Sequence, residues 1–179
     1  MVKKVLALGS HVLFIPDGTD FSSPSSGTSG RESKPDQDDS NWIDLGYISG
    51  IEIDPQQEEK EVWAASPGQL RLVDIIEMKR GLNFTMDLEE VGAVVLQLAF
   101  KTLALVDGTP DQQYNPTEGS TVKGWTKIQN YDQTDAIYNT LDLYVYMRLN
   151  SALRIADDVI RPQIFCRMLQ STLNSGVFA

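Results

Sequence analysis

Histidine and cysteine are almost missing from this chain of 179 residues, because His11 and Cys166 are the only examples of each. One cysteine cannot form a disulfide within the chain. A zinc site built from several histidine and cysteine ligands is excluded within one chain, as is a di-histidine metal centre. General acid–base catalysis usually recruits histidine. The inventory therefore predicts a protein that is not an enzyme and that needs no cofactor.

Positive charge is also scarce. The chain has 15 lysine and arginine residues against 25 aspartate and glutamate residues, which gives a formal net charge of -10. Such a surface repels a phosphate backbone and disfavours a protein that grips nucleic acid. The glycine-rich motifs that cradle nucleotide phosphates are missing from the sequence.

Long apolar runs are missing as well. No stretch approaches the roughly 18 apolar residues that cross a bilayer, so no membrane-spanning segment is expected. Residues 1–8 imitate the start of a secretory signal, with two lysines before an apolar run. Gly9, Ser10 and His11 interrupt that run, and the pattern instead predicts a mature N-terminal strand that reaches Ile15.

The rest of the composition is that of a folding chain, with 41% hydrophobic and 22% charged residues. A chain of this length is expected to form a single domain over residues 1–179. Residues 16–41 stand apart, because Ser, Asp, Gly and Pro dominate the run PDGTDFSSPSSGTSGRESKPDQDDSN. This segment cannot bury enough apolar surface to order itself alone, and it is predicted to be a long loop.

Alternating apolar residues indicate a mainly β fold. Residues 82–88 give the clearest strand, with polar residues between Leu82, Phe84, Met86 and Leu88. Residues 42–54 predict a half-buried strand that bends at its glycines, Gly46 and Gly50. The residues expected on its buried face are Ile43, Leu45, Tyr47, Ile51 and Ile53. Further strands are expected at 62–65, 122–130, 140–150 and 163–173, the last of them burying Cys166.

The period changes after the strand at 82–88. Val91, Val94, Val95 and Leu98 follow the i, i+3, i+4, i+7 spacing of an amphipathic helix, and Asp87 can cap it. The sequence thus predicts one helix at about residues 88–101. The expected architecture is an antiparallel β-sandwich or barrel with this helix at its side and long loops.

Two groups of residues are candidate assembly contacts. Glu58, Glu59 and Glu61 form an acidic cluster beside Trp63, which indicates either a solvated hairpin or a docking edge with an aromatic anchor. In the strand at 140–150, one face carries Tyr144, Tyr146 and Arg148, residue types that protein interfaces favour.

The acidic run after residue 35 also invites a calcium hypothesis. Asp36, Asp38 and Ser40 take the first, third and fifth positions of a calcium loop, but Asn41 and Tyr47 stand where an EF-hand needs Gly and Glu. A monomeric β-sandwich that binds calcium or a carbohydrate at its loops remains the alternative function. The residues available to such a site are Asp36, Asp38, Trp42 and Trp125.

The blocks WIDLGYISGIEID at 42–54 and GLNFTMDLEEVGAVVLQLAF at 81–100 resemble the tail tube, or major tail, proteins of long-tailed bacteriophages. In that family an early strand of the Leu-Gly-x-x-x-Gly kind precedes an alternating strand, which runs into a Glu-rich helix start and an apolar helix. The likeness covers about half of the chain, and the segments at 16–41 and 162–179 lie outside it.

The resemblance implies a virion protein, assembled in the host cytoplasm, whose partners are other copies of itself and other tail proteins. Members of the tail tube family fold as a β-sandwich with a flanking helix and form hexameric rings through edge strands. The rings stack into a hollow tube through which DNA leaves the capsid without specific binding. A loop between early strands projects onto the next ring, and residues 55–68 stand at the corresponding place. Head–tail completion, baseplate ring and type VI secretion tube proteins share these features and stay open as alternatives.

Overall fold

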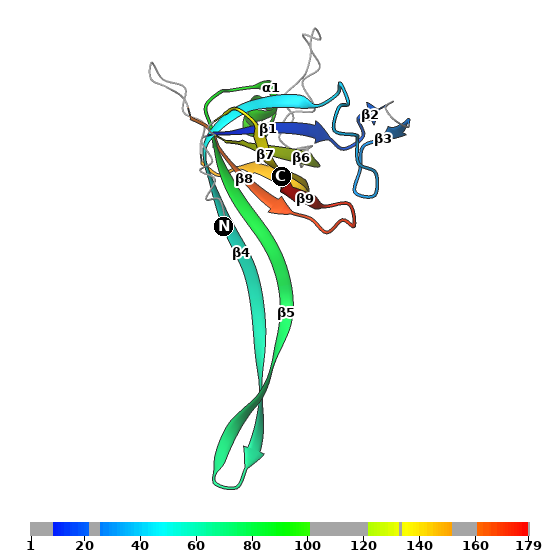
Figure 1. Ribbon diagram of the computed structural model, residues 1–179. Coiled ribbons are helices and arrows are strands. Elements are labelled where there is room, and N and C mark those ends of the chain that lie inside the picture. Colours follow the sequence, from blue (N-terminus) through cyan, green and yellow to red (C-terminus); the bar gives the residue numbers. More distant parts are fainter. Residues whose placement is uncertain (1–8, 22–25, 101–121, 133, 152–160, 179) are drawn as a thin grey trace.

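The computed structural model describes residues 9–21, 26–100, 122–132, 134–151 and 161–178. Strands dominate them, and one helix lies at the side of the sheet (Figure 1). In chain order the elements are β1 Gly9–Pro16, β2 Asp20–Phe21, β3 Gly27–Thr28, β4 Ile43–Ser66, β5 Gln69–Leu88, α1 Ala93–Phe100, β6 Val122–Tyr131, β7 Ile137–Leu149, β8 Gln163–Met168 and β9 Ser175–Phe178.

The main sheet closes on itself. Its strand order is β6-β1-β4-β5-β8-β7-β9, and β6 also pairs with β7. Six strands therefore form an antiparallel barrel, while β9 extends β7 along the same edge as β8. The prediction of a mainly β antiparallel fold with one helix is confirmed.

The barrel interior is the main core. Phe84, Met86 and Leu88 of β5 are buried, as their alternation predicts, and Cys166 of β8 is fully buried beside them. Each large apolar side chain removed from water in this way stabilises the fold by about 1.5–3 kcal/mol. Gly124 of β6 allows β1 to approach, because a Cβ there would lie 2.1 Å from the Ile15 carbonyl oxygen.

The helix begins later than predicted. Asp87 and Leu88 belong to β5, so Asp87 does not cap the helix, and α1 starts at Ala93. Asp87 pairs with Gln163 across the β5–β8 ladder, and the Leu88 N–H donates to the Pro162 carbonyl oxygen at 2.9 Å. Because these long-range hydrogen bonds hold Asp87 and Leu88 in the strand, Asp87 is not available as a helix cap. The predicted end at residue 101 lies outside the described residues.

The start of β4 does not keep one buried face. Leu45 and Ile48 are buried, but Tyr47 is 56% exposed and Ile43 and Ile53 are exposed as well, so the predicted face is wrong for these three residues. The ladder with β1 shifts register next to Gly46, whose φ of 88° bends the strand. A second shift between Ile48 and Gly50 interrupts the ladder with β5. The bend expected at these glycines is confirmed, and it explains why the alternation breaks.

Much of the segment at 16–41 packs on the outside of the barrel. Trp125 donates from Nε1 to the carbonyl oxygens of Gly30 and Ser33, at 2.8 and 3.1 Å. Lys34 forms an ion pair of 2.7 Å with the buried carboxylate of Asp142 on β7. The side chains that bind this segment thus belong to strands elsewhere in the chain. The composition of the segment alone therefore does not predict that it packs on the barrel.

Candidate assembly surface

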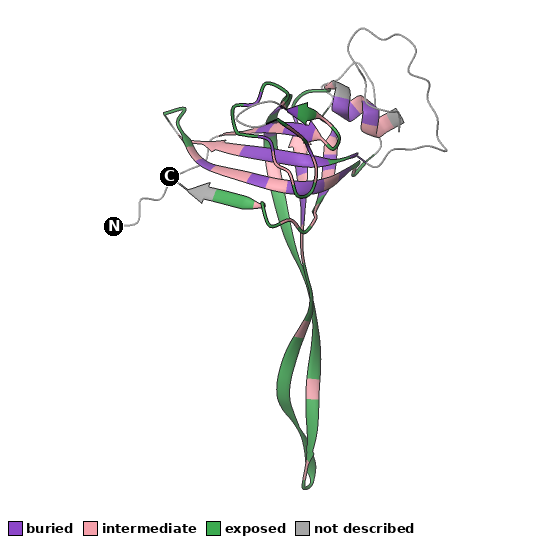
Figure 2. Ribbon diagram, turned by 90° about the vertical axis from the view of Figure 1, so that its right-hand side faces the viewer, coloured by how far each residue is buried: buried purple, intermediate pink, exposed green. Residues whose placement is uncertain are grey.

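The long hairpin β4–β5 leaves the barrel as a two-stranded ribbon. The ladder between β5 and β8 ends at Asn83, and residues 55–82, here called the arm, extend beyond it. The arm projects far from the barrel and is exposed along most of its length (Figures 1 and 2). The sequence predicts a loop or a long hairpin here, with a short strand at 62–65 and an exposed tip. The structure shows the hairpin with an exposed tip, but its strands are much longer than predicted, because β4 and β5 pair continuously to Ser66 and Gln69.

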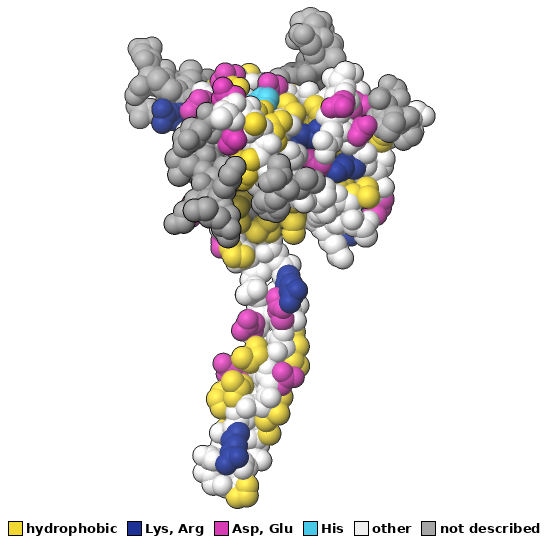
Figure 3. All heavy atoms as spheres, in the orientation of Figure 1, with side chains coloured by type: hydrophobic (Ala, Val, Ile, Leu, Met, Phe, Trp, Pro, Cys, Tyr) yellow, Lys and Arg dark blue, Asp and Glu magenta, His cyan; other side chains and the backbone are white. Residues whose placement is uncertain are grey.

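The arm carries an unusual share of exposed apolar side chains. Of the thirteen large hydrophobic residues that are exposed among the described residues, seven lie on it. They are Trp63, Leu70, Leu72, Val73, Ile75, Ile76 and Met78. In the space-filling view, hydrophobic side chains appear along the whole arm between charged ones (Figure 3). Concentration of exposed apolar surface on one element marks an interaction site.

The strand register gathers three of these side chains, together with Ala65, near the end of the arm. Trp63 faces Leu72, and Ala65 faces Leu70 on the same side of the ribbon. This apolar tip is open, with Trp63 52% and Leu70 68% exposed. The Trp63 indole donates from Nε1 to a Glu61 carboxylate oxygen at 2.9 Å, which leaves the ring face free for a partner.

Both long edges of the arm are free of partner strands in the described part of the chain. β4 pairs with β1 only up to Ile48, and β5 pairs with β8 only up to Asn83. Beyond these residues the backbone N–H and C=O groups on each outer edge can pair with another chain. A two-stranded ribbon is marginally stable in water by itself, so pairing or packing would stabilise it.

Charged groups stabilise the part of the arm next to the barrel. Lys79 forms an ion pair with Glu58 across the strands, and Arg80 forms one with Glu77. The hydrogen bond from Arg80 lowers the pKa of Glu77 and keeps this carboxylate ionised. Glu59 faces Glu77 directly, a like-charge arrangement that Arg80 offsets.

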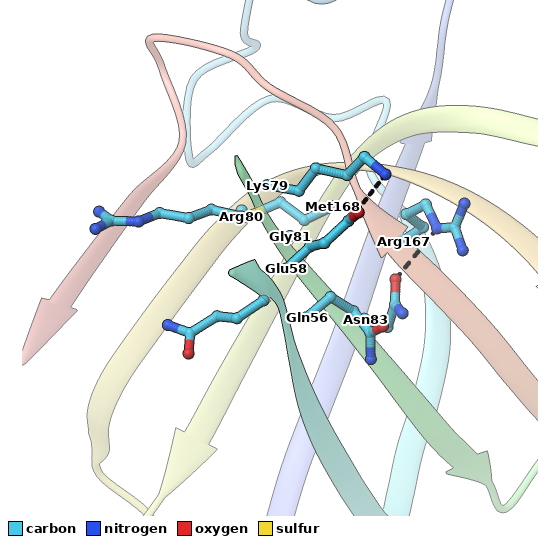
Figure 4. Close-up of a pocket in the computed structure, with 9 residues that line it drawn as sticks. Gln56, Glu58, Lys79, Arg80, Gly81, Asn83, Arg167 and Met168 are labelled. Carbon is cyan, nitrogen blue, oxygen red and sulfur yellow. Dashed lines mark hydrogen bonds and ion pairs between the residues drawn. The ribbon is translucent and has the colours of Figure 1, made fainter. Parts of the chain in front are cut away.

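A hollow of about 560 Å³ opens where the arm leaves the barrel (Figure 4). It lies in the fork between β5 and β8, and its lining includes Lys79, Arg80 and Arg167. The Arg167 Nε donates to Asn83 Oδ1 at 3.2 Å, and its guanidinium remains exposed. Sequence reasoning did not single out this cluster, because its residues come from strands that are distant in the chain.

The predicted contact residues divide between the arm and the barrel. Glu58, Glu59, Glu61 and Trp63 all lie on β4 in the arm and are exposed. The exposed face predicted on β7 is wrong for Tyr144, which is 5% exposed and packs against Trp125.

The other two β7 residues are more accessible. Tyr146 is half-buried, and Arg148 is exposed with its guanidinium carbon 4.6 Å from the Phe165 ring centre. As assembly contacts, these two residues stay a prediction.

The alternative loop site has a mixed outcome. Asp36 and Asp38 are exposed, but Trp125 is fully buried and cannot stack on a sugar. Trp42 is half-buried, with Lys127 Nζ 4.3 Å from its ring centre. Among the described residues, no group of three or more His, Cys, Asp or Glu side chains is placed to hold a metal ion.

The single histidine and cysteine have structural surroundings. Burial raises the pKa of the Cys166 thiol well above its usual value, so the reactive thiolate is disfavoured. His11 Nε2 lies 2.7 Å from a carboxylate oxygen of Asp44, and its ring packs against Tyr47 with 5.1 Å between ring centres.

Comparison with known proteins gives little. No family model matches the sequence, and no curated protein matches it. One similar solved structure is the cryo-EM structure of the anti-feeding prophage baseplate, six-fold symmetrised. It aligns over 99% of this chain and 98% of that chain, with 11% identity and a TM-score of 0.48. These values establish neither a family nor a function. Within the described residues, no helix is long and apolar enough to cross a membrane.

Proposed function

We propose that this chain is a structural subunit of a phage tail, and that it assembles into hexameric rings stacked as a tail tube. The observation that carries the proposal is the arm, which extends exposed apolar side chains and two free strand edges away from a barrel with its own core. A chain that acted alone would leave this surface in water, where it invites aggregation. A neighbouring subunit that covers the arm would bury its apolar tip and complete its backbone pairing.

The acidic character of the chain suits this role. A net charge of -10 would let DNA pass through a lumen without being held there. The sequence blocks at 42–54 and 81–100, which resemble tail tube proteins, contribute the first part of β4, the last part of β5 and α1. On this proposal the protein is not an enzyme, resides in the virion and is assembled in the host cytoplasm. Its partners are other copies of itself and other tail proteins.

The test is negative-stain electron microscopy of the purified protein, with its mass measured by light scattering across a range of concentrations. We expect rings or hollow tubes of uniform width. Rings that never stack would instead favour a baseplate or head–tail completion ring. A protein that stays a monomer at every concentration would contradict self-assembly.

A pair of variants links the result to the arm. Trp63→Ser combined with Leu72→Ser replaces two of the four apolar side chains of the tip and is expected to abolish assembly without unfolding the barrel. Ile137→Ser combined with Leu173→Ser makes the matched change at exposed apolar residues away from the arm, and it should assemble normally. Equal assembly by both variants would contradict the role of the arm.

A further inference from the structure

The two strands of the hairpin carry net charges of opposite sign, on side chains that stand alternately on the two faces of the ribbon. On β4, residues 52–61 hold five acidic residues against one lysine. On β5, residues 69–82 hold three basic residues against two acidic ones, and Arg167 of β8 adds a fourth cation at the fork. We call these the acidic edge and the basic edge.

Ion pairs inside the hairpin involve only some of these charged side chains. Lys79 and Arg80 have intrachain partners in Glu58 and Glu77. The acidic edge keeps Asp54, Glu59 and Glu61 outside the ion pairs of the described residues, against Lys60 of the same strand. The basic edge likewise keeps Arg71 and Arg167, against Asp74. All seven of these side chains are exposed.

We propose that the acidic edge of one copy lies along the basic edge of the next copy, and that the fork hollow at Arg167 receives a carboxylate of that neighbour. The proposal rests on the self-assembly proposed above and specifies which surfaces meet. Two acidic edges repel each other, so two-fold pairing of β4 with β4 is disfavoured, whereas Asp74 weakens the corresponding repulsion between two basic edges. Pairing of unlike edges is head-to-tail, and it generates a ring or a helical array instead of a closed dimer.

The geometry of the arm fits this arrangement. If the arm is parallel to the common axis, copies related by rotation about that axis project their arms in one direction, and β4 of one copy and β5 of the next run antiparallel. If the arms are level, Asp54 lies at the height of Arg167, because Asp54 pairs with Asn83 and Asn83 pairs with Arg167. The carboxylate of Asp54 would then enter the hollow beside a guanidinium whose described hydrogen bond goes only to an amide oxygen.

A charge-swap experiment tests the pairing. The acid-reversed variant carries Asp54→Lys, Glu59→Lys and Glu61→Lys, and the base-reversed variant carries Arg71→Glu and Arg167→Glu. Both sets leave the ion pairs Lys79–Glu58 and Arg80–Glu77 intact. Each variant alone should stay monomeric under conditions in which the wild type assembles, whereas an equal mixture should assemble with the two variants alternating.

Cysteine cross-linking then separates head-to-tail from two-fold pairing. Lys60 and Ile76 face each other in the arm, are exposed, and form no ion pair among the described residues. Lys60→Cys chains mixed with Ile76→Cys chains should give disulfide-linked dimers, and neither variant alone should do so. Because Cys166 is fully buried, it should contribute little background.

The failures are distinguishable. Efficient cross-linking of Lys60→Cys alone would overturn the head-to-tail arrangement in favour of β4–β4 pairing. Wild-type rings or tubes combined with normal assembly of each charge-reversed variant would overturn the edge assignment and leave the proposed function standing. A wild-type protein that never assembles would overturn both.

Discussion

Lys127 donates a hydrogen bond of 2.6 Å from Nζ to the backbone carbonyl oxygen of Gln37, and it does so while only 1% exposed. Burial lowers the pKa of Lys127, and the nearby carboxylate of Asp142 opposes that shift. The bond fastens the acidic loop around residues 36–39 to the outer face of β6. It lies beside a small second core formed by Ile15, Trp125 and Tyr144 with Trp42 and Leu169.

Replacement of Lys127 should therefore loosen this loop. Lys127→Met removes the donor and leaves the Gln37 carbonyl without it, so we expect a loss of about 1–3 kcal/mol in the free energy of unfolding. Urea titration measures this loss. Lys123→Met, an exposed position on the same strand, is the control and should change stability by less than about 0.5 kcal/mol. Equal stability of the two variants would show that other contacts hold the loop.

Tyr144 should make stability fall at alkaline pH. Its hydroxyl donates to Asp17 Oδ2 at 2.5 Å, and burial and this bond raise its pKa above the usual value of 10. As pH rises above 10, the tyrosine ionises in the unfolded state before the folded state, so the unfolded state binds fewer protons and stability drops. Tyr144→Phe should cost about 1 kcal/mol at pH 7 and lose this part of the pH dependence. Unfolding by urea at several pH values up to 11 checks this, with Tyr138→Phe as control.

Gly124 should tolerate no side chain. A Cβ at this position would meet the Ile15 carbonyl oxygen at 2.1 Å and the Phe14 ring at 2.9 Å. Because the first contact is with backbone of the paired strand β1, Gly124→Ala should cost about 3 kcal/mol or prevent folding. Gly30→Ala adds a Cβ with no atom within 4 Å and should remain near wild-type stability. Thermal unfolding of the two variants gives the comparison, and similar melting temperatures would contradict the close approach.

The barrel should fold without the arm. Gln56 faces Gly81, so residues 57–80 can be replaced by Asn-Gly, a favoured two-residue hairpin turn. We expect the shortened chain to keep a cooperative unfolding transition, because the core residues lie outside the deleted segment. It should also stay monomeric by light scattering. Loss of the cooperative transition would show that the arm is needed for folding.

Calcium should leave the chain unchanged. The exposed Asp36 carboxylate caps its own loop by accepting the Gln37 N–H at 2.8 Å. We expect millimolar calcium to leave the melting temperature where it is, both in the wild type and in Asp38→Asn. A calcium-dependent rise that Asp38→Asn abolishes would favour the loop-binding alternative.

Local patterns predicted those elements whose signal agrees with the barrel. The alternation that ends at Leu88 and the apolar surroundings of Cys166 both identify buried strand positions, because side chains of a strand alternate between two faces. The acidic cluster beside Trp63 was also predictable, because charged residues next to an aromatic residue can be recognised from the sequence alone.

Other features depended on contacts between distant segments. Tyr144 and Arg148 share a strand face. The loop at 29–42 covers Tyr144, whereas Arg148 remains exposed to solvent. Arg167 meets the arm only because β8 pairs with β5.

By itself the sequence determined the fold class, the poverty of catalytic groups and the acidity of the chain, because residue type and spacing suffice for these. Only the tertiary structure decided that residues 55–82 stand free as an arm. Their exposure follows from where the barrel closes and its ladders to β1 and β8 end, and pairing between distant strands sets those points.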